Sequence, residues 1–166
     1  MYKTLKDFQD DWAYESESTS KVLGALTDES LNQKVTDDGR SLGFIAWHTA
    51  ITIPELMGKT GLKVDGPAED APVPTSAAEI KAAYDKASSS LVEALSNNWN
   101  DGMLEEVDDM YGEPWKKGQS LYNLVAHQCH HRGQMTVLMR QAGVRVPGFY
   151  GPAKEDWAEM GMEPLP

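Results

Sequence analysis

The four histidines are the residues whose type and spacing point most directly to chemistry, and three of them lie in the string His127-Gln-Cys-His130-His131. With about 100° of rotation per helical residue, His127 and His131 lie about 40° apart and one turn apart in height, so their rings can converge. His130 lies about 60° to the other side of His127, among polar positions, and we expect it outside a shared site. Imidazole pairs at this spacing bind metals, but buried structural histidines use the same spacing.

His48 supplies a third candidate from another part of the chain. It lies midway along Phe44-Ile-Ala-Trp-His-Thr-Ala-Ile51, within the most apolar segment. A neutral imidazole buried there needs a partner for each nitrogen, and a metal ion satisfies one of them. Three inward-facing histidines, His48, His127 and His131, therefore favour one divalent metal ion. Imidazole accepts zinc, nickel, copper and iron alike, so the ligand type does not select the metal.

Cys129 is the only cysteine, so the chain has no internal disulfide and no CxxC motif. On a helix it points about 160° away from His127, which indicates a packing residue rather than a nucleophile of the histidine site.

The elements that must position the histidines are helices. Apolar residues recur at steps of three and four in four segments, which predicts helices at 2–26, 41–59, 76–95 and 120–142. Pro54 falls inside the second segment and predicts a kink or local break. Two long connections, a crossover at 61–75 without structure of its own and a second at 97–119, are typical of lids or walls. A short helical turn is expected near 156–160.

Two acidic residues lie where they could enter a site. Glu15 and Thr19 interrupt the apolar stripe of the first helix, which favours a wet bundle edge over a functional cavity. Glu55 faces the same way as His48, about 10 Å further along the helix axis. It could line a cavity or be solvated, and neither acid is predicted to be a general base.

Other side chains of the histidine string face different ways. Gln134 shares the face of His127 and is expected to be a hydrogen-bond partner of a metal ligand. Arg132 lies at about 140° and is expected to tie the helix to a loop or a dimer partner, through an acidic residue. Trp47, Trp115 and Tyr150 are candidate pocket walls whose ordinary role is packing.

The composition excludes several other classes of function. The chain has 166 residues with 40% hydrophobic and 25% charged residues, as expected of one globular domain spanning 1–166. The net charge of -11 repels phosphate backbones, so no nucleic acid is expected as a partner. No apolar run reaches the roughly 18 to 20 residues that span a bilayer, and residues 1–11 lack a signal peptide's pattern. We therefore expect a cytoplasmic protein with no membrane partner.

The last predicted helix carries a string with a known counterpart. The run Ala126-His-Gln-Cys-His-His-Arg-Gly-Gln134, followed by Leu138-Met-Arg-Gln-Ala-Gly143 and Pro147-Gly-Phe-Tyr-Gly151, resembles the last core helix of the DinB-like (DinB/YfiT) family. Ala46-Trp-His48 resembles the histidine element of that family's second helix. The resemblance implies an all-α, up-up-down-down four-helix bundle with long crossover loops, often a homodimer.

The same resemblance implies a metal, commonly zinc or nickel, at the positions of His48, His127 and His131. Family members include transferases and isomerases that use low-molecular-weight thiols. The leading hypothesis is therefore a metal-dependent transferase that joins a small thiol to an electrophilic small-molecule substrate. A metal-dependent hydrolase, and a non-catalytic metal-stabilised dimer or sensor, are the alternatives.

Overall fold

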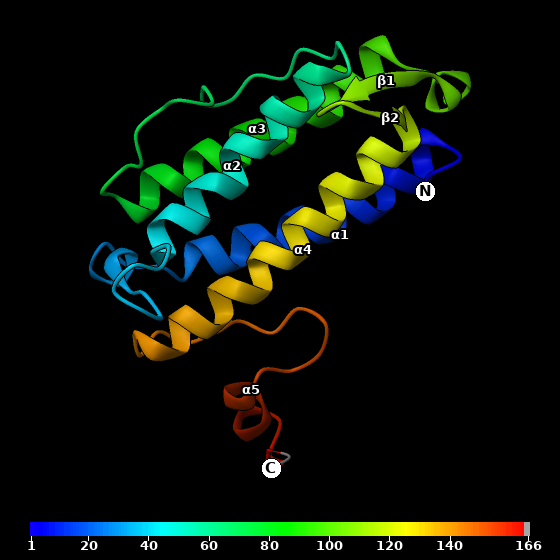
Figure 1. Ribbon diagram of the computed structural model, residues 1–166. Coiled ribbons are helices and arrows are strands. Elements are labelled where there is room, and N and C mark those ends of the chain that lie inside the picture. The colour runs from blue at the N-terminus through cyan, green and yellow to red at the C-terminus, as the bar shows by residue number, and fades with distance from the viewer. Residues whose placement is uncertain (165–166) are drawn as a thin grey trace.

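Four long helices form a bundle in the computed structural model, which describes residues 1–164 (Figure 1). This confirms the four-helix bundle predicted from the sequence. The helices are α1 (Leu5–Gly24), α2 (Leu42–Lys59), α3 (Ala77–Asn98) and α4 (Lys117–Gln141). The short elements are η1 (Glu29–Asn32), η2 (Asp101–Glu105), β1 (Val107–Met110), β2 (Glu113–Lys116) and α5 (Lys154–Glu159).

The helix directions follow from contacts between the chain ends. The Gln9 side chain bonds Ser96, and Ser20 bonds Asp85, so α1 and α3 are antiparallel. Tyr2 at the start of α1 lies beside Gly118 at the start of α4, so α1 and α4 run the same way. Figure 1 shows α2 and α3 both running opposite to α1. The order is up-down-down-up, which differs from the expected up-up-down-down.

The connections explain this order. The chain turns back at one end of the bundle between α1 and α2, through η1, and at the other end between α3 and α4, through η2 and the strands (Figure 1). Only the segment between α2 and α3 returns along the whole bundle, and it contains no helix or strand, as predicted. The connections before α2 and after α3 are about as long as the one between α2 and α3. Length alone therefore could not show which connection crosses the bundle.

Three of the four long helices begin after a hydroxyl residue that caps them, and α4 begins after Lys116 without a side-chain cap. Thr4 accepts a hydrogen bond from the Asp7 amide at 3.0 Å, and Ser41 accepts one from the Phe44 amide at 3.1 Å. Such caps satisfy amides that have no partner within the helix. The predicted break at Pro54 is absent, because α2 continues through it to Lys59.

The crossover segment is fitted closely to α2 and α3. A Cβ atom on Gly66 would lie 3.0 Å from Cγ of Pro54 and 3.1 Å from Cβ of Ala87, so a larger residue here would require these neighbours to shift by a few tenths of an ångström. The indole N–H of Trp47 also donates to the carbonyl of Ala71 at 3.0 Å. These contacts hold the crossover beside the middle of α2, where His48 lies.

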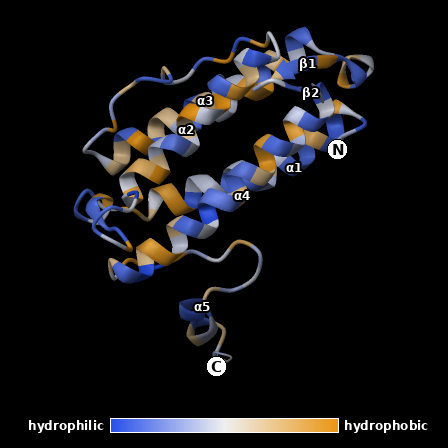
Figure 2. Cartoon of the chain, in the orientation of Figure 1, coloured by the Kyte–Doolittle hydropathy of each residue, from blue (hydrophilic) through white to orange (hydrophobic). Residues whose placement is uncertain are grey.

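One hydrophobic core joins the four helices. Its largest fully buried side chains include Trp12, Phe8 and Tyr84, and the Trp12 indole donates to Ser88 at 3.0 Å. Figure 2 shows that α4 is hydrophilic along its middle although it lies within the bundle. None of the helices among residues 1–164 is long and apolar enough to span a membrane.

A β-hairpin was not predicted and lies in the second long connection. Strands β1 and β2 pair antiparallel, with Met110 opposite Glu113, around a two-residue turn. Tyr111 and Gly112 have φ of 61° and 86°, as a type I′ turn requires at both central positions. Tyrosine is strained there, and its hydroxyl donates to both carboxylate oxygens of Glu55 at 2.9 Å.

Candidate metal centre

Three histidines from two helices converge at the middle of the bundle. Nε2 of His127 lies 3.3 Å from Nε2 of His48 and 3.0 Å from Nε2 of His131. The three candidate ligand atoms all lie within 4.8 Å of one another. Two nitrogens on one metal at about 2.0–2.1 Å are separated by about 2.9–3.4 Å in tetrahedral or octahedral geometry. The two distances from Nε2 of His127 to the Nε2 atoms of His48 and His131 fit that range.

Hydrogen bonds within the cluster do not satisfy the three imidazoles. Nε2 of His127 faces two other nitrogens, and one proton can bridge only one such pair. Nδ1 of His127 is buried without a hydrogen-bond partner among residues 1–164. A cation at the point of convergence would accept all three Nε2 lone pairs, so the residues fit a metal ion.

Gln134 orients one of the rings. Its side-chain carbonyl lies 2.8 Å from Nδ1 of His131, and it accepts the Nδ1–H proton. This hydrogen bond places the free lone pair of His131 on Nε2, toward the other histidines. Gln134 is thus the hydrogen-bond partner that the sequence predicted.

The electrostatics of the cluster favour neutral imidazoles, which are the form that binds metals. Burial lowers the pKa of His127 to about 4, and the neighbouring histidines add to the effect. Burial likewise lowers the pKa of His48 and of His131. His130 is exposed and is not one of the three converging histidines, although its ring packs against that of His131. It therefore lies outside the cluster, as expected.

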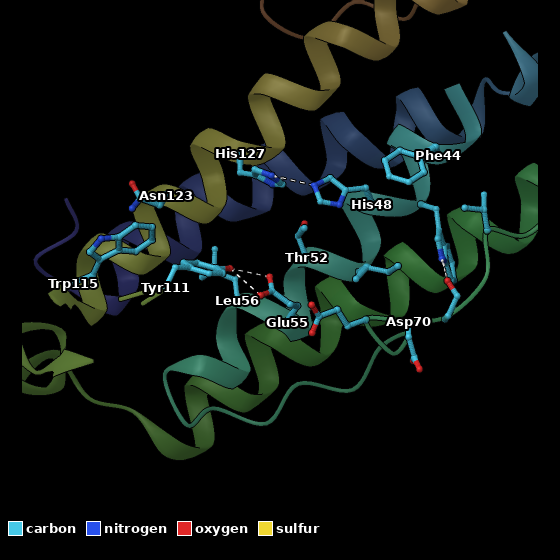
Figure 3. A pocket seen from close by; sticks show the side chains of 15 residues that line it. Phe44, His48, Thr52, Glu55, Leu56, Asp70, Tyr111, Trp115, Asn123 and His127 are labelled. Atoms are coloured by element: carbon cyan, nitrogen blue, oxygen red, sulfur yellow. Dashed lines mark hydrogen bonds between the residues drawn. The ribbon is translucent and has the colours of Figure 1, made fainter. Parts of the chain in front are cut away.

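A cavity of about 650 Å³ opens beside His48 and His127. Figure 3 shows their rings pointing toward one another at one end of it, and Tyr111 with Glu55 further along. The volume suits a small molecule. Its apolar walls come from α2, the crossover and the hairpin, and include Phe44, Trp47, Ile51, Leu56, Val73 and Trp115.

The residues that line the cavity test several of the roles predicted from the sequence. Trp47 and Trp115 line it, as do Glu55 and the unpredicted Tyr111. Tyr150 lies elsewhere, so its interpretation as a wall of this pocket is wrong. The alternation of polar and apolar residues around Tyr111-Gly112 is weak, and this explains why the hairpin wall was missed.

The other face of α4 carries a buried ionic cluster. Arg132 is 0% exposed and donates to the carbonyl of Glu15 at 3.0 Å, to Thr19 at 3.1 Å and to the Tyr150 hydroxyl at 2.9 Å. It also forms an ion pair with the Glu15 carboxylate, to which Tyr150 donates as well. Glu15 and Thr19 are buried, so the interpretation as a wet bundle edge is wrong.

The pKa shifts of this cluster follow its contacts. Burial opposes ionisation of Glu15, but hydrogen bonds from Tyr150 and Arg132 outweigh it and lower the pKa of Glu15. Burial raises the pKa of Cys129, whose thiol lies 3.3 Å from Glu15 and 3.1 Å from the Tyr150 hydroxyl. The protonated thiol donates to Glu15 and lies outside the histidine cluster, as predicted, but it forms hydrogen bonds rather than packing alone.

Fold and cluster together define a four-helix bundle with a histidine triad at the wall of a small-molecule cavity. The DinB family model matches residues 1–164, and the chain belongs to the DinB family. It is 50% identical over 163 residues to the Bacillus subtilis (strain 168) protein YrdA, a match that covers 98% of each chain.

Solved structures agree with this assignment. A DinB-like protein from Bacillus cereus ATCC 10987 superposes with a TM-score of 0.86 at 49% identity, covering 89% of this chain and 99% of the other. The B. subtilis DinB-like protein YjoA gives a TM-score of 0.62 at 14% identity, covering 86% and 97% of the two chains. The second similarity concerns the fold alone.

Proposed function

We propose that this protein binds one divalent metal ion, zinc or nickel, and joins a small thiol to an electrophilic small molecule. The ligands would be His48, His127 and His131. The observation that carries the proposal is the convergence of three neutral imidazoles, 3.0 and 3.3 Å apart at two contacts, on the wall of a cavity of about 650 Å³.

The donor set indicates a reactive site rather than a structural one. Three neutral ligands leave the charge of a divalent ion uncompensated and leave coordination positions open. Such an ion supplies a positive charge that favours a bound thiol as its thiolate. Gln134 would fix the orientation of the His131 ring, and the apolar walls would hold the electrophile and exclude water from the thiolate.

The net reaction balances without a redox step. A bond forms between the thiol sulfur and an electrophilic carbon, and the bond from that carbon to the leaving group breaks. The leaving group departs with the bonding electron pair, and the thiol proton passes to solvent. No oxidant or reductant is needed.

The hydrolase alternative lacks a base near the triad. Within residues 1–164, the cluster of candidate ligands contains the three histidines and no carboxylate. Glu55 lies two helical turns from His48, and its carboxylate accepts the Tyr111 hydroxyl. The absence of a carboxylate from the histidine cluster itself makes hydrolysis the second candidate.

Metal analysis, followed by a transfer assay, tests the proposal. We expect about one zinc or nickel ion per chain in the wild type, loss of that ion in His131→Ala, and retention in His130→Ala. Equal metal content in all three proteins would refute the ligand assignment.

The transfer assay then uses metal-loaded protein, a panel of small thiols and 1-chloro-2,4-dinitrobenzene, with the thioether product identified by mass. Turnover above that of a His48→Ala control supports the transferase. Metal binding without thiol-dependent turnover would refute it and favour the non-catalytic dimer or sensor.

The expected homodimer and cytoplasmic location stay predictions. Light scattering during size-exclusion chromatography distinguishes a dimer from the 18.3 kDa chain.

A further inference from the structure

Outside the histidine triad, few side chains can donate a hydrogen bond into the cavity, and most of these already have an acceptor. The Trp47 indole N–H donates to a carbonyl of the crossover, and the Thr52 hydroxyl donates to a carbonyl within α2. The Tyr111 hydroxyl donates to a carboxylate of α2. The Asn123 amide and the Trp115 indole N–H form no hydrogen bond with any side chain or carbonyl of residues 1–164. These two groups are therefore the unused donors of the cavity lining.

Asn123 and Trp115 come from consecutive elements of the chain. Asn123 lies one helical turn before His127 on α4, about 6 Å along the helix axis. Trp115 lies on β2, which leads directly into α4. Figure 3 shows both side chains beyond His127 as seen from His48. The two N–H groups thus belong to the part of the cavity next to the triad, on the side of the hairpin.

We propose that the Asn123 amide and the Trp115 indole N–H bind an acceptor oxygen of the electrophile. The substrate class is then a neutral aryl electrophile that is activated by a conjugated nitro or carbonyl group. This inference rests on the proposed function and names its substrate class. Both residues contact the substrate in it and determine specificity.

The charges of the cavity lining explain the need for neutral donors. Attack by a thiolate moves negative charge onto the electrophile. The 15 lining residues include no lysine and no arginine, so no side-chain cation of the lining can stabilise that charge. Neutral N–H groups that face a developing oxyanion perform this role in enzymes, and the effect is large where water is excluded. Within the lining, the free N–H groups of Asn123 and Trp115 are available for it.

The distance from the triad selects the kind of electrophile. A thiolate at the histidines attacks a carbon beside His127, whereas Asn123 lies about 6 Å further along α4. An oxygen bonded to the attacked carbon would lie beside the triad and not beside Asn123. An oxygen joined to that carbon through an aromatic ring lies several bonds away and receives charge by conjugation. The aromatic walls formed by Phe44, Trp47 and Trp115 suit such a ring.

Atoms and electrons balance in this reaction. The thiol sulfur forms a bond to the ring carbon, and an electron pair moves through the ring onto the acceptor oxygen, where the two N–H groups stabilise it. The pair then returns to the ring, and the bond to the leaving group breaks. The leaving group, chloride in the test substrate, departs with the bonding pair, and the thiol proton passes to solvent.

A pair of unreactive ligands tests the donors without metal or thiol. Acetophenone and α-methylstyrene have nearly the same shape and differ in a carbonyl oxygen against a methylene group. In the metal-free protein, acetophenone should shift the NMR resonance of the Trp115 indole N–H downfield, and α-methylstyrene should not. Loss of the resonance in Trp115→Phe assigns it. Asn123→Leu should weaken acetophenone binding about fivefold relative to α-methylstyrene, within the range of one neutral hydrogen bond.

Two further variants separate recognition from folding. Asn123→Asp keeps the shape of the side chain but removes its N–H donors, so it should weaken acetophenone binding at least as much as Asn123→Leu. Asn97→Leu, an exposed substitution on α3, should leave the ratio of the two affinities unchanged. Circular dichroism verifies that each variant is folded.

A rate comparison tests the substrate class in metal-loaded protein with 2-mercaptoethanol as the thiol. For 1-chloro-2,4-dinitrobenzene, kcat/KM should fall by about tenfold to hundredfold in Asn123→Leu, because one donor to the developing oxyanion is lost. For benzyl chloride, in which the leaving group takes the negative charge, kcat/KM should change by less than about threefold.

Failures of the two proposals are distinguishable. An unshifted Trp115 resonance, or an unchanged affinity ratio in Asn123→Leu, would overturn the acceptor site whatever the turnover. Equal losses of kcat/KM for the two electrophiles would overturn the assigned substrate class. Absence of turnover with both electrophiles, together with the acetophenone shift, would overturn the transferase and support the acceptor site alone.

Discussion

Replacing Arg132 by methionine is expected to destabilise the bundle by about 3–5 kcal/mol, because the substitution leaves a buried carboxylate without its cation. Arg132 is 0% exposed and Glu15 is 9% exposed, so water cannot replace the lost contacts. After the substitution the Glu15 carboxylate keeps only the Tyr150 hydroxyl and the weak donor Cys129. For a chain of this length, about 2–4 °C per kcal/mol predicts a Tm lower by about 6–20 °C.

A double-mutant cycle measures the pair itself. Glu15→Gln, Arg132→Met removes both charges and should recover at least half of the loss, as buried ion pairs replaced by neutral residues of similar volume often do. Arg132→Lys keeps the charge without the paired N–H groups and should fall between the wild type and Arg132→Met. Urea unfolding followed by circular dichroism at pH 7 gives the four free energies of the cycle, for the wild type, Glu15→Gln, Arg132→Met and the double variant. A loss below about 1 kcal/mol in Arg132→Met, or purely additive effects, would refute the reasoning.

The contribution of Glu15 to the free energy of unfolding should depend on pH with a definite sign. The pKa of Glu15 is lowered in the folded state, so its contribution is fully present above the unfolded value of about 4.3. It is lost as the pH falls through the lower folded value. The stability difference between the wild type and Glu15→Gln should therefore shrink below about pH 4.

The remaining predictions concern the histidine cluster. Gln134→Ala should lower metal affinity by about 10–100-fold in a chelator competition, and unchanged affinity would mean that the Gln134–His131 bond does not orient the ligand. In the metal-free protein, NMR titration should find a pKa of about 4 for His127, and a value at or above the ordinary 6.5 would contradict its burial among imidazoles. Metal at about 100 times its Kd should stabilise the wild type by about 2.7 kcal/mol, raising Tm by about 5–11 °C, with no shift in His131→Ala.

The sequence predicted the features that depend on residues close together in the chain. Helical periodicity predicted the four helices, and angular arithmetic separated His127 and His131 from His130. The placement of His48 against them came from the family resemblance together with its apolar surroundings. In the structure, the packing of α2 against α4 brings the three rings together.

The missed features depend on contacts between distant segments. Glu15 and Thr19 lie one helical turn apart in an apolar stripe, which could have suggested a buried partner for them. Arg132, on the side of α4 away from the histidines, is that partner. Nothing in either segment alone shows that they meet. The hairpin was missed because its strands are short and polar, with Pro114 inside one of them.

The two faces of α4 explain why the triad is formed by the protein fold itself. On one face, Arg132 fixes α4 to α1 through Glu15 and Thr19. On the other, the fully buried Gln128 donates to the carbonyl of Thr49 at 3.0 Å. Gln128 and Thr49 adjoin His127 and His48 in sequence, so this hydrogen bond joins α2 and α4 beside the histidine triad. If a metal ion binds the triad as proposed, the metal-dependent rise in Tm reports its affinity for the folded chain over the unfolded one.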